Sequence, residues 1–183
     1  FLTLSGLLIF HGIVVYGLLL KATTGLSPGI LRSKMRRVWA FAFSTASSGA
    51  PLPITLRTVE KRLGVPKSVA GFAIPLGATV NMDGTAIMQG VATVFIAQVY
   101  GIELSAMQLL MVILTATLAS IGTAAVPGVG LITLSLVLTQ AGLPVEGVAL
   151  IIGVDRLLDM IRTAVNVTGD ATVATIVAYR EGQ

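Results

Sequence analysis

Two short polar motifs interrupt strongly hydrophobic sequence and carry groups that could bind a cation. The first is Asn81-Met82-Asp83-Gly84-Thr85, and the second is Asn166-Val167-Thr168-Gly169-Asp170. Each motif places an amide, a carboxylate and a hydroxyl around a glycine. Burying such groups is costly unless a partner satisfies them. A bound cation would do so, because carboxylate and amide oxygens are hard ligands.

Polar side chains recur along the segment that contains the second motif. Asp155, Asp159, Arg162, Asn166 and Asp170 follow one another at intervals of three or four residues, so a helix presents them on one face. A charge at the centre of a membrane helix costs roughly 2.5–3.5 kcal/mol on insertion scales. We therefore expect this face to look into a polar cavity.

Composition places these motifs in an integral membrane protein. Hydrophobic residues make up 55% of the chain and charged residues 11%, whereas soluble domains are about 25% charged. The apolar runs are too long for a transmembrane barrel and do not alternate with polar residues, so we predict an all-α membrane protein. The chain begins inside an apolar run, which we interpret as part of a longer protein. The single histidine, His11, does not indicate a hydrolase triad. The absence of cysteine excludes disulfides and thiolate metal sites.

Apolar stretches and turn residues divide the chain into five segments. We predict a transmembrane helix over 1–21, a re-entrant hairpin over 29–63, a broken transmembrane helix over 68–100, a second re-entrant hairpin over 105–140 and a last transmembrane helix over 144–179.

Flanking charges orient these segments. Basic clusters flank the first hairpin and predict that it opens from the cytoplasmic side. The second hairpin has no basic flank and is expected to open from the outer side.

An architectural repeat connects the two halves of the chain. Each half has a short arm, a small-residue elbow, a return arm and a spanning helix that we expect the motifs at 81–85 and 166–170 to interrupt. Inverted repeats with broken helices are typical of secondary transporters, in which unwound backbone binds cations and helix N-termini face anionic groups. The residues therefore favour a transporter, and a nucleic-acid site or an enzyme is not indicated.

Four segments of the chain resemble the glutamate transporter family of dicarboxylate/amino acid:cation symporters in its prokaryotic form. They are STASSGAPLP, PLGATVNMDGTAIMQG, LASIGTAAVPGVG and GVDRLLDMIRTAVNVTGD. The resemblance implies most of that family's transport domain, with the N-terminal scaffold absent. It also implies an elevator-type symporter in the lipid bilayer of a bacterial or archaeal plasma membrane. A homotrimer is expected for the full-length protein.

The resemblance implies Na⁺ as the co-transported ion, with no organic cofactor. One sodium site would use Gly77, Asn81, Asn166 and Asp170. A second would use Thr79, Met82, Ser120, Ile121 and Thr123. A third would use Asn81 and Asp83, with partners from an absent helix.

The resemblance also implies a substrate site between the hairpin tips. Arg162 would bind the side-chain carboxylate and Asp159 the α-amino group of aspartate or glutamate, because a guanidinium fork matches a carboxylate. The remaining contacts would come from Ser47, Ser48, Thr85, Val126, Gly130, Thr163 and Asn166.

Several alternatives stay open at this point. The protein could be a proton-coupled glutamate symporter, a C4-dicarboxylate symporter, a passive channel or a fragment that binds without transporting. Arg156 could pair with Asp155 or Asp159, or contact substrate. His11 is expected to pack or contact a helix, with a proton relay the lesser alternative. Ala125 stands where family members usually have glycine, which would restrict a left-handed turn at the second tip.

Overall fold

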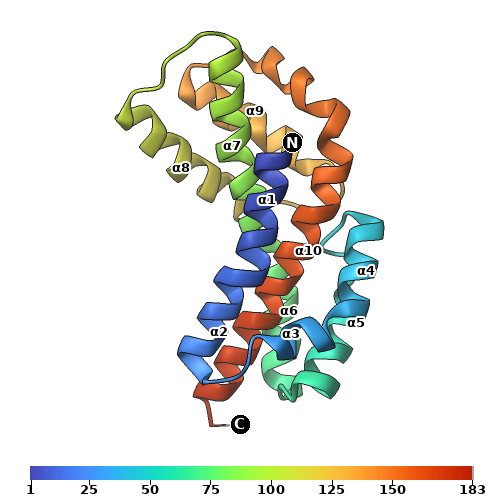
Figure 1. Cartoon of the computed structure of the whole chain (residues 1–183). Helices are drawn as coiled ribbons and strands as arrows, with labels where there is room; N and C mark the ends of the chain where they lie inside the picture. Colours follow the sequence, from blue (N-terminus) through green and yellow to red (C-terminus); the bar gives the residue numbers. More distant parts are fainter. Residues whose placement is uncertain (183) are drawn as a thin grey trace.

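The computed structural model describes residues 1–182, which fold into helices joined by turns (Figure 1). No strand occurs among these residues, which confirms the predicted all-α class. The helical elements are α1 (Leu2–Phe10), η1 (His11–Val15), α2 (Tyr16–Thr24), α3 (Gly29–Lys34), α4 (Arg36–Thr45), α5 (Leu52–Thr58), η2 (Val59–Leu63), α6 (Lys67–Val80), α7 (Asp83–Val99), α8 (Ala106–Ser120), α9 (Val129–Ala141), η3 (Val145–Val148) and α10 (Ala149–Arg180).

The first three elements form one rod. The rod runs over Leu2–Thr24 and is, among residues 1–182, the one helix both long and apolar enough to cross a membrane. It continues three residues past the predicted end at position 21, and Gly25 ends it in the left-handed conformation with φ 72°. Glycine adopts this helix-ending conformation without a Cβ penalty. The middle of the rod, η1, is a π-helical turn.

Two helical hairpins approach each other from opposite ends of the molecule. The first consists of α4 and α5, and the second of α8 and α9 (Figure 1). Their elbows fall in the two Gly/Pro-containing segments, where neither arm can continue as a helix. The two tips meet near the middle of the molecule, where Gly49 donates a backbone hydrogen bond to the Ala125 carbonyl at 3.2 Å.

The break in the middle of the chain is narrower than the first motif. We expected Asn81 to Thr85 to be unwound, but α7 already begins at Asp83. The helix can start there because the backbone N–H groups of Thr85 and Ala86 both bond to the Met82 carbonyl, each at 3.0 Å. Non-helical backbone is therefore confined to Asn81 and Met82.

The expected interruption of the last helix is wrong. α10 runs without a break from Ala149 to Arg180 and passes straight through the second motif. Thr168 and Thr172 turn their hydroxyls onto carbonyls one helical turn earlier, at 2.6 and 2.7 Å. The helix keeps its backbone bonds because the polar side chains of the motif find partners on neighbouring helices.

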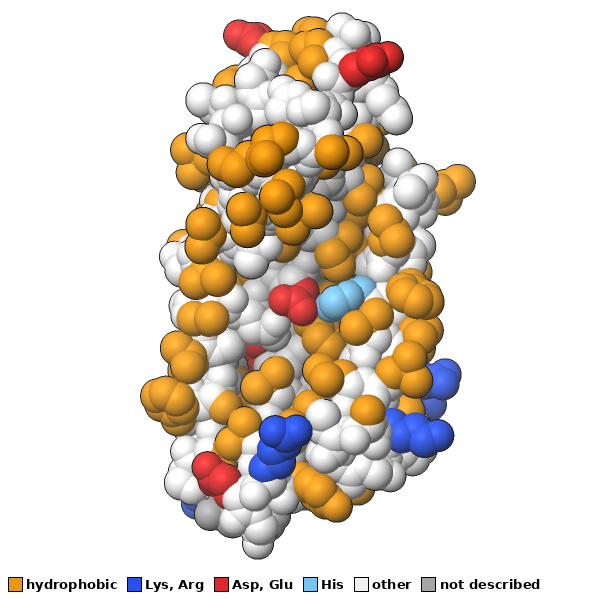
Figure 2. All heavy atoms as spheres, turned by 90° about the vertical axis from the view of Figure 1, so that its left-hand side faces the viewer, with side chains coloured by type: hydrophobic (Ala, Val, Ile, Leu, Met, Phe, Trp, Pro, Cys, Tyr) orange, Lys and Arg blue, Asp and Glu red, His pale blue; other side chains and the backbone are white. Residues whose placement is uncertain are grey.

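Charge divides the molecule along its length. Figure 2 shows a largely apolar face on which Lys and Arg gather toward one end, whereas acidic side chains occur at both ends and near the middle. The basic residues that flank the first hairpin, in α3 and η2 away from its tip, include Arg32, Lys34, Lys61 and Arg62. The cytoplasmic orientation, which was inferred from these same basic residues, stays a prediction.

Helix α10 contributes to both hydrophobic clusters of the molecule. One cluster joins α1, α2, α7, α8, α9 and α10, and the other joins α2, α3, α4, η2, α6 and α10. Between them, α7 and α10 approach closely at Gly84. A Cβ built on Gly84 would lie 2.8 Å from the Arg162 carbonyl oxygen and 3.0 Å from Asn166 Oδ1. The polar groups of α10 therefore depend on a glycine for their distance from α7.

We predict that Gly84→Ala destabilises the protein by about 1–3 kcal/mol, because backbone atoms of α10 cannot yield to the new methyl group. Thermal unfolding of the purified protein, expressed from its complete gene, measures the effect. Gly90→Ala on the same helix is the control, since a Cβ at Gly90 would meet nothing within 4 Å. Equal unfolding temperatures for the two variants would contradict the prediction.

Candidate functional site

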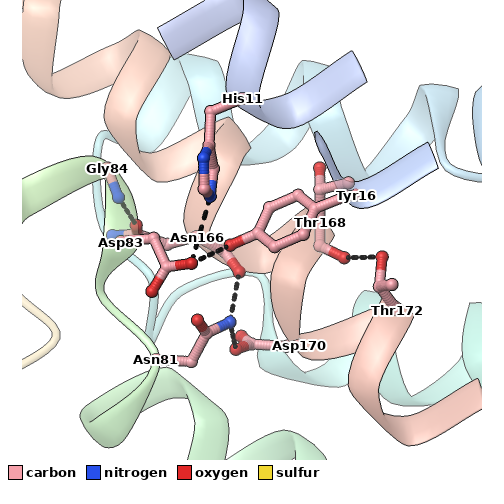
Figure 3. A network of polar contacts seen from close by, with 9 residues as sticks. All are labelled: His11, Tyr16, Asn81, Asp83, Gly84, Asn166, Thr168, Asp170 and Thr172. Carbon is pink, nitrogen blue, oxygen red and sulfur yellow. Dashed lines mark hydrogen bonds and ion pairs between the residues drawn. The ribbon is translucent and has the colours of Figure 1, made fainter. Parts of the chain in front are cut away.

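The break between α6 and α7 lies against the second motif on α10. The Asn81 side-chain amide donates to Asp170 Oδ1 at 2.9 Å and to the Asn166 carbonyl at 3.2 Å (Figure 3). Asn166 Oδ1 in turn accepts the backbone N–H of Gly84 at 2.8 Å. Both motifs therefore meet in space, and each supplies oxygen atoms to the same region.

Gly77 completes this group of oxygens. Its carbonyl accepts the backbone N–H of Asn81 at 2.7 Å, and a Cβ built on Gly77 would overlap the Asp170 carboxylate. The structure thus brings Gly77, Asn81, Asn166 and Asp170 together. Here the amide nitrogen of Asn81 faces Asp170, so binding a cation through both side chains requires the amide to rotate its oxygen inward.

Asp83 lies beside this group and bonds to two side chains of the N-terminal rod. Tyr16 donates its hydroxyl to Asp83 Oδ2 at 2.9 Å, and His11 Nε2 lies 3.1 Å from the same oxygen. The rings of His11 and Tyr16 meet edge to face, with centroids 4.7 Å apart. The expectation of a helix contact for His11 agrees with this arrangement. Sequence reasoning missed Tyr16, because an isolated tyrosine in an apolar helix carries no motif.

The residues predicted for the second sodium site come from two segments, the end of α6 and the elbow of the second hairpin, which one backbone hydrogen bond joins. The Thr79 carbonyl accepts the backbone N–H of Gly122 at 2.8 Å, which joins the end of α6 to the elbow of the second hairpin. Ser120 turns its hydroxyl onto the Thr117 carbonyl at 2.8 Å, and Thr123 turns its hydroxyl onto the Ala119 carbonyl. Met82 is buried within the break, while Ile121 is exposed at the elbow. The elbow of the second hairpin is thus joined to the C-terminal end of α6, two residues before the break.

Arg162 is the largest fully buried side chain among the described residues, with 1% of its surface exposed. Its Nη2 atom lies 2.9 Å from Asp159 Oδ1 and 3.1 Å from Asp155 Oδ1. These ion pairs lack good hydrogen-bond geometry, and Nε and Nη1 have no partner within residues 1–182. A buried guanidinium with unused donors is suited to a ligand carboxylate.

Three predicted substrate residues lie close to Arg162 in the fold. A Cβ on Gly130 would lie 2.6 Å from Arg162 Nη1, so α9 passes directly over the guanidinium. Thr163 follows Arg162 on α10, and Thr85 follows the close contact at Gly84; both are buried. The Asp159 carboxylate is already engaged, since its Oδ2 accepts the backbone N–H of Gly128 at 2.9 Å.

The two hairpin tips close over this region and share one acceptor. Ser47 donates its hydroxyl to the Ala125 carbonyl at 2.6 Å, and the Gly49 N–H bonds to the same oxygen. Ser48 is buried at the first tip, whereas the Val126 side chain is 54% exposed. The backbone N–H of Val126 bonds to the Ala124 carbonyl at 2.8 Å.

The structure bears on two open points about single residues. Among residues 1–182 Arg156 forms no ion pair with Asp155 or Asp159, which both pair with Arg162, and it lies exposed on α10, so a contact with substrate stays the hypothesis for Arg156. Ala125 needs no left-handed backbone. Within residues 1–182, the one non-glycine residue with positive φ is Ala46 at the first tip, with φ 49°.

Comparison with known proteins gives a consistent set of relatives. The model of the Sodium:dicarboxylate symporter family matches residues 1–180. An "Excitatory amino acid transporter" of Caenorhabditis elegans is 52% identical over 176 residues, which are 96% of this chain and 35% of that protein. The human "Excitatory amino acid transporter 2" is 46% identical over 172 residues, 94% of this chain and 30% of that protein. The chain thus spans about a third of the length of the curated relatives it matches.

These relatives are animal proteins. They support the glutamate transporter family but not the expected prokaryotic form, and they do not support a bacterial or archaeal membrane.

We predict that Ser47→Ala loosens the contact between the tips. A neutral hydrogen bond contributes about 0.5–1.5 kcal/mol, so the population with separated tips should rise about twofold to tenfold. The chain has no cysteine, which allows spin labels at Ala50→Cys and Val126→Cys to report the tip separation. Ser44→Ala is the control, because that hydroxyl bonds within its own helix, to Phe41. Identical distance distributions for the two variants would argue against the shared acceptor.

Proposed function

We propose that this chain, which belongs to the Sodium:dicarboxylate symporter family, takes part in sodium-coupled transport of an acidic amino acid across the plasma membrane. The family consists of multi-pass membrane transporters, so the chain is not an enzyme. The observation that carries the proposal is the buried Arg162 with unused donors, held on the same helix face as Asp159, Asn166 and Asp170.

In this proposal Arg162 binds the side-chain carboxylate of aspartate or glutamate through its free Nε and Nη1 donors. Asp159 binds the α-amino group, which requires its carboxylate to exchange the Gly128 contact for the ligand's ammonium. Thr85, Thr163 and Asn166, the Gly130 region and the backbone of Ser47, Ser48 and Val126 complete the substrate site. A guanidinium and a carboxylate side by side match an amino acid that carries an additional acid.

Sodium would bind where the two motifs meet. Gly77, Asn81, Asn166 and Asp170 supply oxygen ligands for one ion, and Asn81 with Asp83 for another. The remaining ion would lie between Thr79, Met82 and the elbow residues Ser120, Ile121 and Thr123. Hard oxygen donors of this kind suit a small cation. Asn166 belongs to both the substrate and the cation sets, which supports coupling between the two ligands.

The two hairpins would act as gates at opposite sides of the membrane. The shared Ala125 carbonyl supports a closed state in which both tips cover the substrate site. Movement of this unit against a scaffold, in an elevator-type cycle, and assembly into a trimer would belong to the complete transporter. The printed names of the relatives, excitatory amino acid transporters, support an acidic amino acid as substrate.

We expect Arg162→Ala to abolish sodium-dependent uptake of labelled aspartate into liposomes. Removing one partner of a buried charge pair costs about 2–5 kcal/mol, or at least about 30-fold in affinity. Arg162→Lys keeps a positive charge beside Asp155 and Asp159 but loses the fork, and it should fold yet bind poorly. The matched control is Arg156→Ala, which removes an exposed guanidinium from the same helix. Uptake by the wild-type protein that ignores a sodium gradient would refute sodium coupling.

The substrate class is tested with Asp159→Asn. Loss of this charge should weaken aspartate binding about tenfold or more while leaving succinate binding nearly unchanged, because only the amino acid presents an ammonium group. Calorimetric titration with aspartate, glutamate and succinate, with and without sodium, measures the difference. Tighter binding of succinate than of aspartate by the wild-type protein would favour a C4-dicarboxylate symporter instead.

A further inference from the structure

The π-helical turn in the N-terminal rod changes which residues of that rod face the first motif. In an α-helix, residues five apart point about 140° away from each other. The turn His11–Val15 instead closes with a bond from the Tyr16 N–H to the His11 carbonyl, the i→i+5 pattern of a π-helix. Tyr16, five residues after His11, consequently points toward the same side of the rod as His11. The side chains of both residues therefore reach Asp83.

Tyr16 lies deeper in the molecule than His11 and contacts both motifs. Its side chain is buried, and its hydroxyl donates to Asp83 Oδ2 at 2.9 Å. Gly169 of α10 lies against the hydroxyl end of the Tyr16 ring. A Cβ at Gly169 would overlap the Tyr16 hydroxyl and the Asn81 amide, and it would lie 2.7 Å from Tyr16 Cζ. Tyr16 thus occupies the point where α2, α7 and α10 meet (Figure 3).

Asp83 is oriented by these contacts. Both bonds from the rod end on Oδ2, so Oδ1 is left without a partner among residues 1–182. The side chain is 44% exposed, and Figure 2 shows the histidine beside a carboxylate midway along an otherwise apolar face. A carboxylate held at one oxygen presents the other in a defined direction.

We propose that Tyr16 is a positioning residue for the cation site of Asn81 and Asp83. Its hydroxyl fixes the rotation of the Asp83 carboxylate, and its ring, packed against Gly169, limits the position of the Asn81 amide. The ligand so served is a monovalent cation bound by Asp83 Oδ1 and Asn81 Oδ1. This inference rests on the proposed sodium-coupled function and adds a residue outside both polar motifs.

A purely structural role for Tyr16 gives a different expectation. Packing depends on the ring, which Tyr16→Phe retains, whereas positioning depends on the hydroxyl, which the variant removes. The hydroxyl bonds to an ionised group, and such bonds are stronger than neutral ones. Its loss should act on cation binding and leave the substrate contacts of Arg162 and Asp159 in place.

The experiment measures aspartate binding to the purified protein, expressed from its complete gene, as a function of sodium concentration. For Tyr16→Phe we expect the half-saturating sodium concentration to rise about threefold to tenfold. Aspartate affinity at saturating sodium should stay within about twofold of wild type. Tyr179→Phe is the matched control, because Tyr179 lies exposed near the end of α10.

Each outcome supports or overturns the proposal. A sodium dependence of Tyr16→Phe equal to wild type and Tyr179→Phe overturns it. An equal loss of aspartate affinity at all sodium concentrations also overturns it, since that indicates a general structural defect. If wild-type binding itself ignores sodium, the proposed function fails instead.

Should Tyr16→Phe not fold, Gly169→Ala provides the second variant. Its methyl group would displace the Tyr16 hydroxyl and the Asn81 amide, and the same shift in sodium dependence is expected. Gly153→Ala on the same helix is its control, because that Cβ would meet nothing within 4 Å. Wild-type sodium dependence in Gly169→Ala would overturn the proposal.

Discussion

The arrangement of this molecule depends on satisfying one polar helix face inside apolar surroundings. Asp155, Asp159, Arg162, Asn166 and Asp170 are all buried on α10, and a buried charge or amide without a partner is strongly unfavourable. Every neighbouring element contributes to solving this problem. The break before α7 brings Asn81 and Gly84 to the lower part of the face, and the second hairpin brings Gly128 and Gly130 to its upper part.

The polar side chains at one end of this face of α10 have hydrogen-bond partners, whereas those at the other end lack some of theirs. Asn166 and Asp170 have direct hydrogen-bond partners, whereas none of the three Arg162 nitrogens has one among residues 1–182; Nη2 makes ion-pair contacts only. Such an imbalance costs stability and therefore calls for a functional explanation. In the proposed function a substrate carboxylate would supply the missing partner, so the least satisfied region is the one we assign to ligand binding.

Much of the fold is predictable from composition and from the positions of glycine and proline. The apolar runs give the helices, and the elbows with Pro51 and Pro127 give the hairpin tips, because a helix rarely continues through such segments. The site residues on α10 follow from their spacing. The wrong prediction is a local one. Asn166 and Gly169 predicted a break in the last helix, yet α10 continues through them, and the Asn166 side chain accepts a hydrogen bond from α7. The π-helical turn and Tyr16 were not predictable, since both follow from packing between distant segments and leave no pattern in the sequence.

Gly169 also has a consequence for how this sequence can change. The space that a side chain would need at Gly169 is shared by the Tyr16 hydroxyl and the Asn81 amide. A larger residue at position 169 therefore displaces the Tyr16 hydroxyl and the Asn81 amide unless those groups have become smaller or moved. The effect of a substitution at any one of these three positions is thus expected to depend on the residues at the other two. Three segments that are far apart in the chain share one small volume.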